Sequence, residues 1–78
     1  MKEVTFIRHN LDKWRGYEST VESSISTPDE LADAYIDITS DLAFSQTHYP
    51  KSRITLYLNI LASAIHNRIY RNKRERRS

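Results

Sequence analysis

The chain has 78 residues, a net charge of +2 at pH 7 and no cysteine. A chain this short forms one domain with a small core, and without cysteine it holds neither a disulfide framework nor a thiolate metal site. One glycine and two prolines argue against a hairpin-rich β protein, and no run approaches the roughly 20 apolar residues of a membrane span. We therefore expect a single helical domain over residues 1–78, soluble as this chain.

Residues 3–24 are predicted to form the first helix, because apolar residues recur there at helical spacing. Glu18 stands at the one position where the apolar pattern breaks. Trp14, with Arg15 and Tyr17 nearby, resembles part of a nucleic-acid surface, but it lies within the apolar stripe, so we expect it in the core. The stripe consists of Val4, Ile7, Leu11, Trp14, Val21 and Ile25.

Residues 28–47 are predicted to form the second helix, whose start has the clearest local signal in the chain. Thr27 is expected as the N-cap, Pro28 at the first helical position and Glu30 as the partner of a capping box. The apolar stripe of this helix is Leu31, Tyr35, Ile38 and Leu42.

The same helix carries an acidic stripe, Asp33, Asp37 and Asp41, spaced four residues apart. Such carboxylates bind metal in helical bundles only where Glu or His converges from facing helices. We expect a solvated or ion-paired face instead, with Asp41 pairing with Arg53 or Arg8.

Residues 51–74 are predicted to form a long third helix after a turn that includes Tyr49, Pro50 and Arg53. Pro50 disfavours helical geometry at Tyr49, which ends the preceding helix. The loops are short, so neighbouring helices run antiparallel, and the fold expected is an all-α, up-down-up bundle of three helices. The core stripe of the third helix is Ile54, Leu58, Leu61 and Ile65, followed by Arg68 or Ile69.

Leu56 and Ile60 lie almost opposite that stripe, at about 100° per residue. We expect them, together with Phe44 or Phe6, to contact a second copy of the chain or a protein partner. The alternative is that they are single exposed apolar residues, which are normal on any surface.

The polar residues give little support for catalysis. His9, His48 and His66 fall on three different elements, and no second ligand stands at helical spacing from His66, so we expect no metal, no cofactor and no enzyme activity. Asn59, His66 and Tyr70 share one flank of the third helix. We interpret them as a half-buried polar row that hydrogen-bonds to a neighbouring helix or turn.

The chain ends in a basic segment, residues 68–78, with six basic residues and one Glu and hence a net charge of +5. Such a segment binds phosphates of nucleic acid or an anionic membrane surface. Residues 1–67 carry −3, from six basic and nine acidic residues, and no base-reading motif is present, so a nucleic-acid-binding module is the second choice. The candidate contacts are Arg68, Arg71, Lys73, Arg74, Arg76 and Arg77.

Three motifs stand out: Tyr49-Pro50 followed by Ser52 and Arg53, Tyr57-Leu58-Asn59 followed by His66, and Ile69-Tyr70-Arg71. With these as its most specific parts, and with looser matches at Asn10 with Trp14 and at Asp41-Leu42, the sequence over essentially its whole length resembles the N-terminal region of the stage II sporulation protein M family, which comprises multi-pass bacterial membrane proteins. The resemblance implies a non-catalytic cytosolic domain at the cytoplasmic face of the bacterial inner membrane, where it binds itself or a partner.

Overall fold

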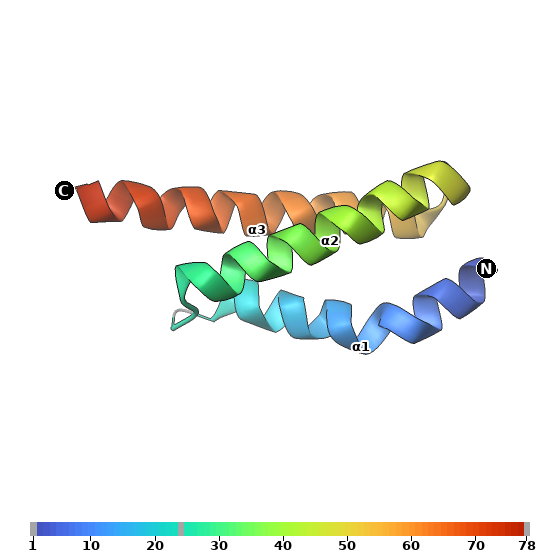
Figure 1. Cartoon of the computed structure of the whole chain (residues 1–78), viewed down its shortest axis with the longest axis horizontal. Helices are drawn as coiled ribbons and strands as arrows, with labels where there is room; N and C mark the ends of the chain where they lie inside the picture. Colours follow the sequence, from blue (N-terminus) through green and yellow to red (C-terminus); the bar gives the residue numbers. More distant parts are fainter. Residues whose placement is uncertain (1, 24, 78) are drawn as a thin grey trace.

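The computed structural model describes residues 2–23 and 25–77, with side chains described through residue 71. Its elements are α1 (Glu3–Glu22), α2 (Pro28–His48) and α3 (Arg53–Arg77). Figure 1 shows α2 running back along the other two helices, so that α1 and α3 point the same way. The described residues contain no strand. The all-α, up-down-up bundle with a long third helix is therefore confirmed.

The start of α2 follows from its capping box. The Thr27 hydroxyl accepts a hydrogen bond from the Glu30 backbone N–H at 3.2 Å, and the Glu30 carboxylate accepts one from the Thr27 N–H. These contacts satisfy N–H groups that the first helical turn leaves without partners. The predicted start at residue 28 is confirmed. By contrast, α1 ends at Glu22 rather than residue 24, and α3 extends from Arg53 to Arg77 rather than over 51–74.

The turn between α2 and α3 is held by Tyr49, which closes α2. Its N–H donates to the Ser45 carbonyl at 2.6 Å. Its carbonyl accepts from the Ser52 N–H at 3.0 Å and from the Thr55 hydroxyl at 2.6 Å. Pro50 lies in this turn, and Arg53 is the first residue of α3.

The core lies mainly between α2 and α3, which pack more closely on each other than on α1. The predicted apolar stripes of α2 and α3 both face this core, since every residue in them is buried or partly buried. Burying an aliphatic or aromatic side chain stabilises the fold by about 1.5 to 3 kcal/mol. The buried cluster consists of Phe6, Trp14, Ala34, Ile38, Ile54, Leu58, Leu61, Ala62 and Ile65.

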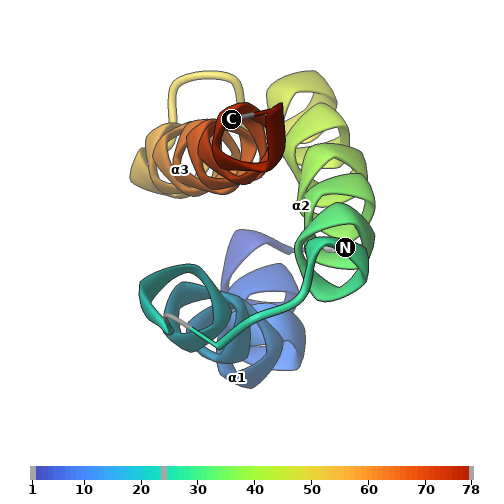
Figure 2. The same ribbon diagram turned by 90° about the vertical axis from the view of Figure 1, so that its left-hand side faces the viewer.

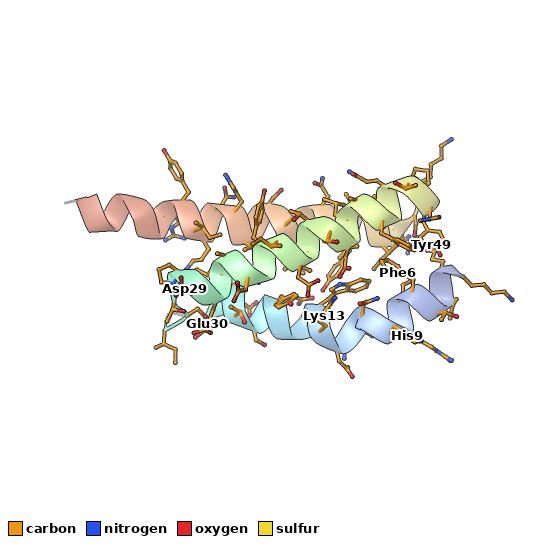
Figure 3. All side chains as sticks on the ribbon, viewed as in Figure 1. Phe6, His9, Lys13, Asp29, Glu30 and Tyr49 are labelled. Atoms are coloured by element: carbon orange, nitrogen blue, oxygen red, sulfur yellow. The ribbon has the colours of Figure 1, made fainter. Side chains whose placement is uncertain are left out.

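Helix α1 covers this pair of helices with aromatic side chains. The buried Phe6 ring lies 5.4 Å from the Trp14 ring, 4.8 Å from Phe44 and 5.9 Å from Tyr49, centroid to centroid. In Figure 3, Phe6 and Tyr49 lie beside each other at the end of the bundle near the α2–α3 turn. Trp14 is fully buried, as predicted.

The ends of the first predicted stripe are wrong. Val4 is 63 % exposed, and Ile25 in the loop before α2 is also exposed. Phe6 is buried in place of Val4, because the start of α1 faces the aromatic rings near the α2–α3 turn and a large ring fills that space. Ile25 lies beyond the end of α1, where the helical period no longer determines which way a side chain faces.

The bundle is elongated, with extents of 46 × 20 × 16 Å. The last turns of α3 reach past the loop that joins α1 and α2 (Figure 1). Of the described helices, none combines the length and apolar character needed to cross a bilayer.

Candidate interaction surface

One side of α3 is uncovered by the other helices. Figure 2 shows α2 along one side of α3 and α1 below it, while the remaining side faces away from both. Leu56 and Ile60 on this side are each 60 % exposed. We call the following residues, all exposed, the outer face of α3: Leu56, Ile60, Ser63, Asn67 and Tyr70.

The outer face has the spacing of a helix-pairing seam. Its residues follow one another at alternate steps of four and three. This is the period at which one helix presents a continuous line of side chains to another. Because the core stripe of α3 also has helical period, α3 carries two stripes on nearly opposite sides and is covered along only one of them.

Between residues 53 and 71, every charged side chain of α3 is basic. Residues 53–71 include no Asp or Glu. Lys51 and Arg53 lie at one end of the outer face and Arg71 at the other, all three exposed, while the face itself is uncharged at pH 7. A partner therefore meets an uncharged, partly apolar line with a positive charge at each end.

A surface depression adjoins the first turn of α3. Lys51, Arg53, Leu56 and Asn59 are among the residues that line it. The depression places the apolar Leu56 side chain close to two cations. It therefore extends the outer face toward the α2–α3 turn.

Phe44 was predicted to share this surface, and that prediction is wrong. Its ring is half-buried, 4.8 Å from Phe6 and 4.3 Å from the exposed His48 ring. Phe44 lies on the side of α2 that faces α1, so it packs in the aromatic cluster. Leu56 and Ile60 are thus the apolar part of the surface.

The predicted half-buried polar row is also wrong, since Asn59, His66 and Tyr70 are all exposed. The His66 ring lies 5.8 Å from the Tyr35 ring of α2, at the edge of the helix pair. These residues are rotated too far from the core stripe of α3 to be covered by α2. Tyr70 belongs to the outer face instead.

Arg68 was predicted to contact lipid or phosphate, but its side chain is partly buried and binds within the bundle instead. Its guanidinium donates to the Ser23 carbonyl at 2.8 Å, and its Nε is buried without a hydrogen-bond partner among the described residues. Arg68 therefore fixes α3 to the end of α1. Arg71 is exposed, and the side chains of Lys73, Arg74, Arg76 and Arg77 lie outside the described residues.

A polar cluster joins α1 to α2. Lys13 Nζ lies 3.2 Å from an Asp37 carboxylate oxygen and 3.0 Å from one of Asp41. Trp14 Nε1–H donates to Asp41 at 2.8 Å, and the Tyr17 hydroxyl donates to Asp37 at 2.5 Å. Figure 3 shows Lys13 between the two helices. The prediction that Asp41 pairs with Arg53 or Arg8 is wrong, because α1 brings other donors closer.

The cluster shifts the proton affinities of its members. Burial, the Asp37 hydrogen bond and nearby carboxylate charge raise the pKa of Tyr17 to about 12. Burial lowers the pKa of Lys13, but its hydrogen bonds to Asp41 and Asp37 outweigh this and raise the pKa overall. Both groups are held in the protonated form, which is the form that binds the carboxylates.

Alkaline pH should therefore weaken the attachment of α1. A tyrosine whose pKa is raised on folding stabilises the fold fully below its unfolded pKa of about 10 and loses this contribution as pH rises toward 12. We expect Tyr17→Phe to be less stable than wild type at pH 8, with a smaller difference at pH 11. Urea unfolding at both pH values measures this; an equal difference at both would show that the Tyr17 proton does not contribute.

One carboxylate of α1 reaches α3, and another reaches the turn that precedes it. The Tyr57 hydroxyl donates to Glu18, and the Ser52 hydroxyl donates to Glu3. Burial and the Glu18 carboxylate raise the pKa of Tyr57 above its usual range. These contacts were not predicted, although Glu18 interrupting the apolar stripe was the signal: a carboxylate at a core-facing position needs a donor from the facing helix.

The described residues form no arrangement suited to metal chemistry. His9 and His48 are exposed on different helices and His66 on a third. No three or more His, Asp or Glu side chains in the described part of the chain gather closely enough to hold a metal ion. The carboxylates in the polar cluster bind a lysine, an indole and a phenol, which are hydrogen-bond donors and not metal ligands of the usual kind.

One family model matches residues 4–71, and it is described as a domain of unknown function (DUF8413). The match covers all but the ends of the chain, so the chain belongs to this family. No curated protein and no solved structure matches.

This match corrects the resemblance to the stage II sporulation protein M family, which is wrong. DUF8413 is a different family, and nothing else supports a sporulation relative. The short motifs that suggested it, such as Tyr49-Pro50 and Tyr57-Leu58-Asn59, combine a proline turn with a helical core pattern. Unrelated helical bundles share those features.

Proposed function

We propose that this DUF8413 domain is a non-catalytic interaction domain that binds a helix of another protein through the outer face of α3. The supporting observation is the exposure of Leu56 and Ile60 within one continuous, uncharged seam. Removing exposed apolar side chains from water is a main driving force of protein association. The polar residues farther along the seam then fix the register.

The rest of the molecule supports this role by holding α3 in place. Its opposite stripe is buried against α2, and Glu18 of α1 and the Ser23 carbonyl at the end of α1 accept hydrogen bonds from it. Glu3 of α1 binds Ser52 in the turn just before it. A helix fixed in this way presents its outer face without first having to fold, so binding costs less conformational entropy.

Site-specific photo-crosslinking tests the proposal. A photoreactive amino acid replaces Ser63 on the outer face or, as control, exposed Arg15 on α1, and adducts formed in the expressing cells are identified by mass spectrometry. We expect one protein to be crosslinked at position 63 alone, and the adduct to be lost with Leu56→Asp/Ile60→Asp. Equal crosslinking from both positions, or adducts indifferent to the double substitution, would rule the proposal out.

The net charge of +5 of residues 68–78 favours a second candidate, contact with an anionic membrane surface. This positive charge is the observation that supports a location of the domain at a membrane surface. Flotation with phosphatidylserine vesicles tests it: Arg74→Glu/Arg76→Glu should reduce binding severalfold. If the chain instead retards duplex DNA in a mobility-shift assay at physiological salt and does not bind vesicles, nucleic-acid binding replaces membrane contact as the second candidate.

A further inference from the structure

We infer that the partner of the outer face of α3 is an acidic amphipathic helix of a different protein, and not a second copy of this chain. The inference rests on the proposed function and specifies the chemistry of its partner. It is carried by the distribution of charge around Leu56 and Ile60.

The first step concerns what the outer face attracts. Lys51 and Arg53 lie beyond one end and Arg71 beyond the other, all exposed, and α3 offers no carboxylate between residues 53 and 71. A helix that seats apolar side chains on Leu56 and Ile60 therefore brings its own flanking residues close to cations at both ends. Carboxylates in those flanking positions are attracted to the arginines, whereas lysines are repelled.

The second step excludes a symmetric pair. In an antiparallel pairing of two outer faces, Arg53 of one copy lies near Arg71 of the other. In a parallel pairing, each of these arginines meets its own counterpart. Both arrangements bring like charges together with no acidic residue between positions 53 and 71 to separate them, and like-charge contacts are a recognised means of rejecting a partner.

The third step concerns the shape of the seam. Ser63 is small and allows a facing helix to approach closely at the centre, while Asn67 adds a hydrogen-bonding amide toward the far end. A polar residue in a helical seam sets register at some cost in affinity. The partner is thus expected to be apolar opposite Leu56 and Ile60, and more polar opposite Asn67.

A displayed peptide library provides the test. Helical peptides with leucines at seam spacing and either Glu or Lys at each flanking position are selected on the immobilised chain. We expect Glu to exceed Lys at least fivefold at the positions nearest Lys51 and Arg53. Lys51→Glu/Arg53→Glu should reverse this preference, and Leu56→Asp/Ile60→Asp should abolish selection. Light scattering of the free chain at high concentration should show a monomer.

The outcomes separate the inference from the proposed function. Selection of Glu and Lys equally, while still requiring Leu56 and Ile60, overturns the acidic partner but keeps the interaction face. A dimer that dissociates on Leu56→Asp/Ile60→Asp has the same consequence. Selection that is absent, or unaffected by that double substitution, overturns both.

Discussion

Replacing Trp14 with alanine is expected to lower the free energy of unfolding by about 3 to 5 kcal/mol. The indole is fully buried, packs against Phe6 at 5.4 Å and Tyr57 at 6.0 Å, and donates to Asp41. Its loss leaves a cavity where α1 meets both other helices. Because a domain of this size is only marginally stable, thermal unfolding followed by circular dichroism should show a large fall in Tm.

Gly16→Ala is the matched control, two residues along the same helix. Gly16 is exposed, its φ is not positive, and an added Cβ meets no atom within 4 Å. Alanine at a helical glycine should raise stability by about 0.5 to 1 kcal/mol. A Trp14→Ala protein as stable as wild type would show that α1 does not pack as described.

Asp41→Ala should cost about 2 to 3 kcal/mol, the second largest effect expected. Its carboxylate, whose side chain is 16 % exposed, accepts from buried Trp14 Nε1–H and lies 3.0 Å from Lys13 Nζ. Removing it leaves a buried indole N–H without an acceptor and breaks an ion pair, and charged hydrogen bonds of this kind contribute about 1.5 to 3 kcal/mol. Urea denaturation measures the change.

Asp33 is the control, because it continues the same acidic stripe but is exposed. Asp33→Ala should alter stability by no more than about 0.5 kcal/mol, as most surface substitutions do. Equal costs at the two positions would mean that the stripe acts only through its overall charge.

Local signals in the sequence predicted the elements well. The Thr27, Pro28 and Glu30 motif determines the start of α2 through contacts within four residues, so no knowledge of the rest of the chain was required. The core stripe of α3 was equally clear, because a helix buried along one side repeats its apolar residues over many turns.

Contacts between helices could not be predicted in the same way, because they depend on how each helix is rotated about its axis. Arg68 binds the Ser23 carbonyl, and Asp41 binds Trp14 and Lys13, because α1 lies where it does. Nothing in the neighbouring sequence shows this. The exposure of Leu56 and Ile60 was predicted, since opposite faces of one helix are separated by periodicity alone. The position of the Phe44 ring could not be predicted in this way, because it depends on which side of α2 meets α1.

The most direct test of the central claim is a nuclear magnetic resonance titration of the isotope-labelled chain with an acidic amphipathic helical peptide. The account predicts amide shift changes concentrated between Lys51 and Arg71, in α3 and the turn before it, and weakened in about 0.5 M salt because the flanking contacts are screened. Leu56→Asp/Ile60→Asp should remove them. Shift changes located on α1, or unchanged by that double substitution, would contradict the claim that the outer face of α3 is the binding surface.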